Sequence, residues 1–353
     1  MAVPVRWLHS QNSRLFALFA DKELGRGKSM NELQVNTPLL QSFEQGLDPQ
    51  HPERGKIPAR VLGYGEISTV FEIQVDELRG LALKRLPLFY TAQEVDRYRA
   101  VYEEYNRLLE EEVGLRLPSH SHATLVGASG RPVFYIIQQQ LAYSSIGHHA
   151  LHALPREQVT RLVTRILREL RRVWDYSRRQ SRVQIGIDGQ ISNWAIDGFD
   201  PEHPLLDDDA RLFYVDTSTP LIRVNGVEQL DTELFLRSAP SFLAWMLRLF
   251  FLKDVVNRYY DLRLVAIDLV ANFYKEQRSD LIPDAIGAVN RFFTGEAAEL
   301  GLQPIDEQTV RSYYREDALI WSLYFSMRKV DRFIRRRLLR RDYPYILPER
   351  IKR

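Results

Sequence analysis

The sequence contains no cysteine, and this absence removes several kinds of chemistry. Disulfide bonds, thiolate metal sites and a cysteine nucleophile are all excluded. Chains without disulfides are usual in reducing compartments, so we expect a cytoplasmic protein. An excess of one charge is also missing, because 48 lysine and arginine residues and 46 acidic residues leave a formal net charge of +2. No overall field therefore attracts nucleic acid or an anionic membrane, and we expect neither as a partner.

Long hydrophobic runs are absent as well. The most apolar stretch, 241–252, is about twelve residues long and contains Arg248, whereas a membrane span needs about twenty. We therefore expect a buried helix at 241–252 and no membrane span. The stretch 1–19 is broken by polar and charged residues, so it lacks the uninterrupted apolar core of a signal peptide.

The pattern of apolar and polar residues changes along the chain. Its 353 residues are enough for two lobes. Residues 1–55 have weak patterning and are interpreted as an N-terminal extension, with a short helix capped by Thr37. From 56 to 140, β-rich runs alternate with one helix, and helices dominate from 141 to 353. We expect an α+β fold in which a small lobe, an antiparallel sheet with one helix, precedes a larger and mainly helical lobe.

Five strands and one helix are predicted in the small lobe. The strands are expected at 57–62, 68–75, 81–86, 122–126 and 133–138. The helix follows the third strand, because Thr91 and Glu94 form a capping box. Its apolar side carries residues at helical spacing, namely Val95, Tyr98, Tyr102, Tyr105 and Leu109.

The turn between the first two strands contains Gly63 and Gly65, and Ser68 and Val70 follow it. Glycines let a backbone approach a phosphate group without a clash from Cβ. A phosphate-binding loop is therefore one interpretation of this turn. A plain hairpin turn is the other.

The third strand places Ala82 and Lys84 on one face, because strand side chains alternate. Ala82 leaves room for a flat base, and Lys84 can reach phosphate groups; a solvent-exposed edge lysine is the alternative. A carboxylate of the following helix would hold the Lys84 ammonium group in place. Glu104 is our choice because it shares a helix face with Leu108, and Glu103 is the reserve.

Candidates for a base and for metal ligands lie in the large lobe. Asp188 and Asn193 are five residues apart on a polar loop, where an aspartate and an asparagine can serve one site. Asp216 ends the apolar run 212–215, and a hard carboxylate oxygen at that place suits Mg²⁺. The structural alternatives are an Asp-Gly turn at Asp188 and a strand-ending turn residue at Asp216.

Together these features resemble the protein-kinase-like superfamily, in particular its aminoglycoside and choline kinase branch. The resemblance rests on their order: a glycine-rich turn, a strand lysine, a helix glutamate, an aspartate with an asparagine five residues later, and a strand-borne aspartate. It covers 56–220 by motif. It implies a phosphotransferase that uses ATP and Mg²⁺ between the two lobes.

The resemblance also assigns roles to single residues. The catalytic set would be Asp188 as base, Lys84 on the phosphates and Glu104 as its partner, with Asn193 and Asp216 as the Mg²⁺ ligands. The ATP-binding set would be Gly63, Gly65, Ser68, Val70, Ala82, Lys84 and the hinge Gln138, Gln139 and Gln140, whose backbone would pair with adenine.

The chain departs from the family pattern at several positions. The departures are Ser68 for the third loop glycine, Gly186 and Ile187 before Asp188, Gln190 for a lysine, Thr217 and Ser218 for Phe-Gly, and Ala239-Pro240-Ser241 for Ala-Pro-Glu. A short catalytic loop without the lysine is more typical of small-molecule kinases, so we expect a hydroxyl-bearing small molecule as acceptor. The alternatives are an inactive nucleotide-binding or scaffold protein and transfer of a nucleotidyl group.

Two further patterns are weighed separately. His148, His149 and His152 have metal-like spacing, but no acidic or fourth ligand stands nearby, so a metal site is disfavoured. The run from Arg332 to Arg341 is strongly basic and could touch nucleic acid or anionic lipid. A solvated helix face is the favoured interpretation, because no RNA-binding aromatic signature accompanies the run.

Overall fold

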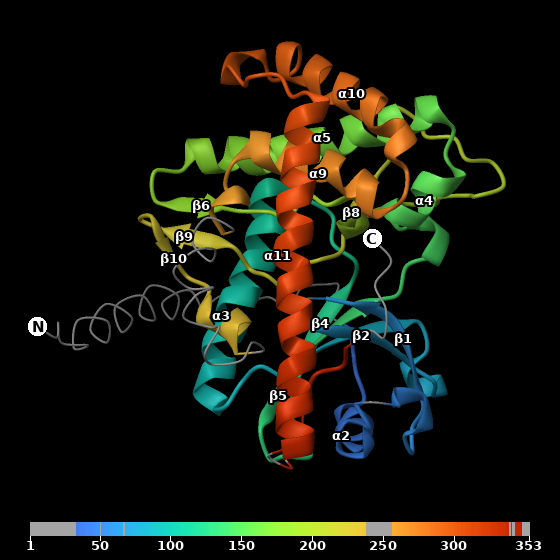
Figure 1. The fold of residues 1–353 in the computed structure, drawn as a ribbon, viewed down its shortest axis with the longest axis vertical. Coiled ribbons are helices and arrows are strands. Elements are labelled where there is room, and N and C mark those ends of the chain that lie inside the picture. The colour runs from blue at the N-terminus through green and yellow to red at the C-terminus, as the bar shows by residue number, and fades with distance from the viewer. Residues whose placement is uncertain are drawn as a thin grey trace, which may run out of the picture.

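The computed structural model describes residues 33–49, 51–65, 68–237, 256–338, 340 and 343–347. The helix expected at 241–252, the motif at 239–241 and the stretch 1–19 therefore lie outside the described residues. No helix within the described ranges is long and apolar enough to cross a membrane. Figure 1 shows two lobes, with a sheet at one end of the molecule and helices at the other.

The small lobe contains the five predicted strands in one antiparallel sheet of order β1-β2-β3-β5-β4. Their bounds are β1 Ala59–Tyr64, β2 Thr69–Ile73, β3 Leu81–Leu86, β4 His120–Val126 and β5 Pro132–Gln139. Helix α3 (Ala92–Arg107) begins at the predicted capping box of Thr91 and Glu94. Val95, Tyr98 and Tyr102 of the predicted apolar side are buried against one face of the sheet, whereas Tyr105 and Leu109 pack into the core of the large lobe. The expected α+β small lobe is confirmed.

The other face of the sheet is covered by α2 (Thr37–Gly46), which comes from the segment interpreted as an extension. Its cap is Asn36, whose side chain accepts a hydrogen bond from the Leu39 amide at 3.1 Å, so the predicted Thr37 cap is one residue late. Asn is a stronger N-cap residue than Thr, and proline is tolerated in the first helical turn. Leu40 and Phe43 of α2 pack into the core of the sheet.

An ion pair that is almost fully buried ties α2 to the sheet. Both oxygens of Glu44 accept hydrogen bonds from Arg85 at 2.7 Å, and the Tyr135 hydroxyl donates to the same carboxylate at 2.5 Å. The Arg85 and Glu44 side chains are only 6% and 1% exposed. Arg85 also donates to the carbonyl of Pro344, so the C-terminal segment 343–347 is attached to the small lobe as well.

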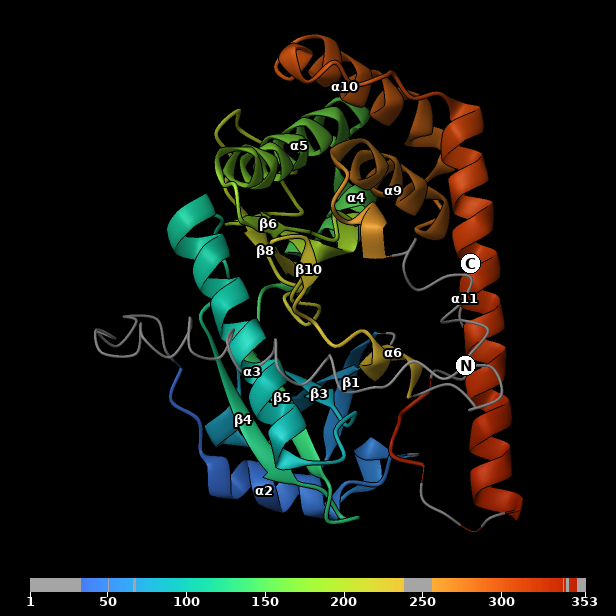
Figure 2. The same ribbon diagram turned by 90° about the vertical axis from the view of Figure 1, so that its left-hand side faces the viewer.

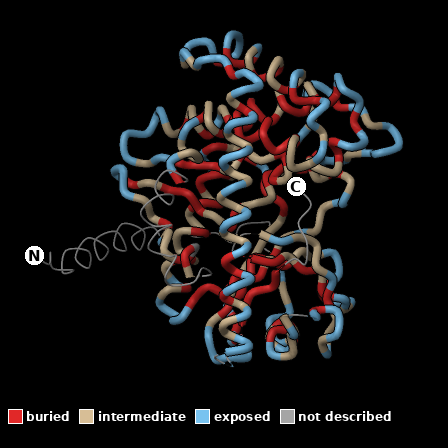
Figure 3. The backbone as a smooth tube through the Cα atoms, in the orientation of Figure 1, coloured by how far each residue is buried: buried red, intermediate tan, exposed pale blue. Residues whose placement is uncertain are grey.

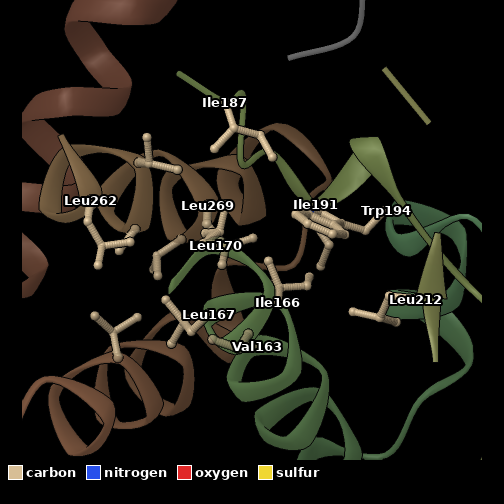
Figure 4. Packing of buried hydrophobic residues seen from close by; sticks show 14 of the residues in the cluster. Val163, Ile166, Leu167, Leu170, Ile187, Ile191, Trp194, Leu212, Leu262 and Leu269 are labelled. Carbon is tan, nitrogen blue, oxygen red and sulfur yellow. The ribbon is translucent and has the colours of Figure 1, made fainter. Parts of the chain in front are cut away.

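The large lobe is mainly helical, as expected. Its helices are α4 Gly147–Ala153, α5 Arg156–Arg179, α6 Glu233–Leu236, α9 Leu262–Lys275, α10 Ile282–Thr294 and α11 Glu307–Phe333. Short strands lie between α5 and α6: β6 Val183–Ile185, β7 Trp194–Ile196, β8 Leu212–Tyr214, β9 Ile222–Val224 and β10 Val227–Glu228. Figure 4 shows α5 and α9 packed against the segment 187–194 through buried aliphatic side chains.

Helix α11 extends along both lobes (Figures 1 and 2). Its N-terminal part packs against α9, and after its C-terminal end Tyr343, Tyr345 and Leu347 enter the core beside α3. Figure 3 shows buried residues in both lobes, whereas α11 is largely exposed. A helix of this length spans about 40 Å at 1.5 Å per residue, so α11 connects the two lobes on one side.

Candidate active site

Strand β3 directs alternate side chains to opposite faces of the sheet, as its sequence predicts. Leu83 and Arg85 face α2 and are buried, whereas Ala82 and Lys84 belong to the opposite face and are partly exposed. Lys84 is in register with Val70 of β2 and with Ile136 of β5. The predicted nucleotide-binding residues of the sheet are therefore neighbours on one face.

The glycine-rich turn closes between β1 and β2. The Gly65 amide donates to the Ser68 carbonyl at 3.0 Å, and a Cβ on Gly65 would lie 2.6 Å from the Ser68 hydroxyl oxygen. A Cβ on Gly63 would meet no atom within 4 Å, so one side of its backbone is open. None of the described residues blocks the approach of a ligand to Gly63 from this side.

Lys84 crosses from the small lobe to the large one. Its ammonium group donates to Asp216 Oδ1 at 2.6 Å and to the Ser218 hydroxyl at 2.9 Å. Ser218 in turn donates to Asp216 Oδ1 through its hydroxyl at 2.7 Å and its amide at 3.1 Å. Burial alone would raise the pKa of Asp216, but the nearby Lys84 charge and these hydrogen bonds hold it below its usual value.

The predicted Lys84–Glu104 pair is not formed, which corrects the sequence analysis. Glu104 accepts two hydrogen bonds from Arg107 at 2.9 Å, and Glu103 accepts one from His122 at 3.0 Å. At about 3.6 residues per turn, the face of α3 that packs on the sheet is its tyrosine stripe, so Glu104 faces away from it, and Glu103 reaches only His122 of the edge strand β4. Leu108 was a poor guide, because the helix widens to a π-helix there.

Tyrosines connect α3 to the large lobe in place of that glutamate. The Tyr98 hydroxyl donates to the Ser218 carbonyl at 2.7 Å, and the Tyr105 hydroxyl donates to the Gly186 carbonyl at 2.9 Å. Burial raises the pKa of both tyrosines, so the hydroxyls stay protonated donors at neutral pH. Helix α3 is thus attached to the residues that flank both Asp216 and Asp188.

Asn193 and Asp216 are brought together by the pairing of β7 with β8. Trp194 of β7 lies opposite Tyr214 of β8, so the residues just outside the pair are adjacent. The Val215 amide donates to the Asn193 carbonyl at 2.9 Å, which fixes this end of the hairpin. The predicted metal ligands therefore share one corner of the site.

Asp188 lies on the loop that also carries Asn193, and buried side chains hold this loop against α5 and α9. The flanking Ile187 and Ile191 are fully buried between α5 and α9 (Figure 4). Gly189 is needed for this packing, since a Cβ there would overlap Val265 of α9. The Asp-Gly dipeptide is thus a close-packing position under α9.

Burial raises the pKa of Asp188 to about 6, and the negative charge of Asp216 adds to this effect. The hydrogen bond from the Gln190 amide and the positive charge of Lys275 both lower the pKa of Asp188, but by less than burial raises it. A carboxyl group whose pKa lies near neutrality can accept a proton in catalysis and release it again. Asp188 has this property and Asp216, with its lowered pKa, does not.

The oxygen atoms present fit a nucleotide-bound Mg²⁺. All bonds that Asp216 receives from the described residues go to Oδ1, which leaves Oδ2 for a cation. The Asn193 side chain donates from Nδ2 to the Asp188 carbonyl, which leaves Asn193 Oδ1. Mg²⁺ commonly takes one or two protein ligands and completes its shell with phosphate and water. In the described ranges, no group of three or more His, Cys, Asp or Glu residues that could hold a metal ion occurs.

The predicted hinge remains part of the sheet. Gln138 pairs with Ala82, the Gln139 amide donates to Ser119, and the Gln140 amide donates to Gly80, both at 2.8 Å. The amides of Gln139 and Gln140 are therefore already used, and the expected adenine contact would need their carbonyl groups or the next residue, Leu141. The assignment of the hinge to Gln138, Gln139 and Gln140 stays a prediction.

Several polar residues beside Asp188 were missed. Asp268, Asn272 and Lys275 recur at helical spacing on α9, which is otherwise apolar, and the first two are buried. Burial raises the pKa of Asp268 well above its usual value, and the Asp188 charge adds to the shift. Lys275 donates to the Gln190 side chain at 3.4 Å. The signal in the sequence was the polar spacing within a buried helix.

Two remaining patterns can also be placed. The three histidines lie on α4 or at its end, and they form no metal-binding group with other described residues. The basic run falls at the end of α11 and on the π-helix Ile334–Leu338, where Arg336 and Arg337 are exposed and Arg335 pairs with Asp331 at 2.9 Å. The interpretation as a solvated helix face stays a prediction.

Most of this chain matches one protein family. Residues 49–332 match a family described as "Family of unknown function (DUF6206)". None of the curated proteins compared with the chain matches it. Among solved structures, the chain is similar to WaaP in complex with acyl carrier protein, with 15% identity, a TM-score of 0.34, and coverage of 73% of this chain and 90% of that one.

Two further solved structures are similar at the same level. The GDP complex of wild-type aminoglycoside 2'-phosphotransferase-IIIa has 9% identity, a TM-score of 0.30, and coverage of 68% of this chain and 94% of that one. A Stt7 homolog from Micromonas algae soaked with ATP has 14% identity, a TM-score of 0.36, and coverage of 78% and 85%. Because these TM-scores are low, the protein-kinase-like fold is assigned from the order of the elements and from the two-lobed arrangement.

Proposed function

We propose that this chain, which belongs to the family of unknown function DUF6206, is a phosphotransferase that moves the terminal phosphoryl group of Mg·ATP to a hydroxyl group of a small molecule. The observation that carries the proposal is the 2.6 Å bond between Lys84 of the small lobe and Asp216 of the large lobe. This bond places the ammonium group that would bind phosphate beside the carboxylate that would bind the metal ion. Asn193 and Asp188 lie on the adjoining loop.

Each residue has a role that follows from its chemistry. Lys84 binds the inner phosphates, and Ser218 and Asp216 hold its ammonium group in place. Asp216 Oδ2 and Asn193 Oδ1 hold Mg²⁺, which neutralises charge on the group in transfer. Asp188 orients the acceptor hydroxyl and takes its proton.

A nucleotide-binding protein without turnover is the second candidate. The same bond favours it, since Lys84 holds one oxygen of the carboxylate on which the metal depends, and no glutamate of α3 draws the lysine away. The two candidates share nucleotide binding and differ in product release. ADP release supports the phosphotransferase, pyrophosphate release indicates nucleotidyl transfer, and the absence of both supports the second candidate.

Mg·ATP should raise the thermal midpoint of unfolding by a few degrees. A ligand that binds only the folded state stabilises it by about 2.7 kcal/mol at a hundred times its Kd. Lys84→Ala should reduce this shift, because the phosphates lose their cation. Lys329→Ala, which removes an exposed lysine on α11, is the matched control and should leave the shift unchanged. An unchanged midpoint at millimolar Mg·ATP, without binding by calorimetry, would overturn the proposal.

Turnover should depend on pH through Asp188. A general base works in its deprotonated form, and burial raises the pKa of Asp188 to about 6. We therefore expect kcat/KM to be level above pH 7 and to fall about tenfold per unit below pH 6. Steady-state rates of ADP release between pH 4.5 and 8 measure this, at a constant ionic strength. A profile that stays level to pH 4.5 would contradict the role of Asp188.

A further inference from the structure

A polar hollow lies beside the catalytic loop in the large lobe. It has a volume of about 300 Å³, which is the lower end of the range for small-molecule sites. The described residues that line it come from α4 and from the end of α9, and they are His148, His149, His152, Lys275, Glu276 and Gln277. Apart from Lys275, whose charge acts on Asp188, none of them has a part in the site described above.

Lys275 and Gln190 connect this hollow to Asp188. Lys275 lines the hollow and donates to Gln190 Oε1 at 3.4 Å, and the Gln190 amide donates to Asp188 Oδ1 at 3.1 Å. Helix α4 also touches the loop directly, because a Cβ on Gly147 would overlap the Ile191 carbonyl. The hollow is therefore connected to Asp188 through two residues, Lys275 of its lining and Gln190 of the loop that carries the base.

The lysine and the glutamate of the lining have opposite formal charges. Lys275 contributes one positive charge and Glu276 one negative charge. Burial lowers the pKa of His148 to about 3 and also lowers that of His149, so both imidazoles are neutral near pH 7. Lys275 and Glu276 together therefore give neither a polycation nor an anion a net attraction. The lining favours an uncharged ligand.

The same residues offer many hydrogen bonds. Ammonium, carboxylate, amide and imidazole groups together supply both donors and acceptors, and a hydroxyl group can use either. The buried His148 Nδ1 has no hydrogen-bond partner. The exposed Tyr143 ring stacks on His149 of the lining with a centroid distance of 3.5 Å. A ring-shaped molecule with several hydroxyl groups matches these features.

We propose that this hollow is the acceptor site and that it takes an uncharged polyhydroxylated molecule, a sugar or a cyclic polyol. The inference rests on the proposed phosphotransferase function. In the reaction, the acceptor oxygen bonds to the terminal phosphorus of ATP as the bond from that phosphorus to the ADP oxygen breaks. The proton of the hydroxyl passes to Asp188, and ADP and the phosphate ester leave.

The test measures ADP release by the full chain with Mg·ATP and a set of matched acceptors. Glucose and myo-inositol are the uncharged members, glucosamine the cationic one and glucuronate the anionic one. We expect an uncharged member to raise ADP release above the rate with Mg·ATP alone. Stimulation by only glucosamine or glucuronate would overturn the inference, as would the absence of stimulation by all four while Mg·ATP still binds. Failure of Mg·ATP to bind would instead overturn the proposed function.

Variants of His149 test the hollow itself, since this residue touches no part of the nucleotide site. His149→Ala should raise the KM for the stimulating acceptor about tenfold, as expected for the loss of a hydrogen bond and a ring contact, and leave the Kd of Mg·ATP unchanged. His149→Phe keeps the stack with Tyr143 and isolates the hydrogen bond. His203→Ala is the control, because His203 is exposed in the loop between β7 and β8. An unchanged acceptor KM in a folded His149→Ala protein would refute the site.

Discussion

Replacing Asp188 with asparagine should lower kcat by about 10²–10⁴-fold, the contribution of a positioned general base. Asparagine keeps the shape of the side chain and the oxygen that accepts from the Gln190 amide at 3.1 Å. It cannot take a proton from the acceptor hydroxyl. Because the change removes a buried carboxyl whose pKa is raised by burial, the folded state should not lose stability. The measurement is single-turnover ADP release at pH 7.5.

The contrast with Asp216 makes this result specific. Asp216→Asn removes the anionic metal ligand and the partner of Lys84, so the Mg²⁺ dependence of nucleotide binding should disappear. Asp188→Asn should bind Mg·ATP almost as tightly as the unaltered chain. Asp208→Asn, at an exposed loop position, is the control for the chemical change and should alter neither property. Equal loss of binding in the Asp188 and Asp216 variants would show that the two roles are wrongly assigned.

Replacing Arg85 with methionine should lower the free energy of unfolding by about 3–5 kcal/mol, the cost of leaving one member of a buried ion pair without the other. Glu44 would keep its hydrogen bond from Tyr135 but would lose two bonds from the guanidinium group. The Pro344 carbonyl would also lose its donor. Urea denaturation followed by circular dichroism measures the change.

Arg60→Met is the matched control for this prediction. Arg60 also bonds to a carboxylate, Glu72 at 2.7 Å, but its side chain is 61% exposed. An exposed pair contributes about 0–1 kcal/mol, so this variant should be nearly neutral. Equal effects of the two substitutions would mean that the Arg85 pair is not desolvated in solution.

The effect of Arg85→Met on binding separates the two faces of β3. Arg85 holds β3 against α2, and the adjacent Lys84 belongs to the nucleotide face. If the fold persists at low temperature, Mg·ATP should still bind, because the variant leaves the bond between Lys84 and Asp216 in place. Below its lowered unfolding midpoint, the variant should therefore bind Mg·ATP with the Kd of the unaltered chain.

Local patterns in the sequence predicted most of the small lobe. Alternation in β3 predicted that Ala82 and Lys84 share a face, and the capping box predicted where α3 begins. The apolar run 212–215 predicted a strand ending at Asp216. These features depend on residues close together in the chain, so short-range rules describe them well.

Contacts between residues that are far apart in the sequence were harder to predict from it. Glu104 was expected to hold Lys84, but the face of α3 toward the sheet consists of tyrosines, and Lys84 bonds to Asp216, 132 residues later. The backbone of Gln138, Gln139 and Gln140 was expected to pair with adenine, and the amides of Gln139 and Gln140 donate to the carbonyls of Ser119 and Gly80. In each case a competing partner came from another part of the chain, which periodicity within one element cannot reveal.

The sequence by itself determined the order of the elements, the two-lobed α+β class and the types of residue available for phosphate, metal and base. Only the tertiary structure decided that α2 and the segment 343–347 pack onto the small lobe, and that Lys275 of α9 adjoins the loop of Asp188. The reason is that element type follows from short-range sterics and hydrophobic period. The choice among many chemically equivalent partners depends on burial and on which side chains long-range packing brings within bonding distance.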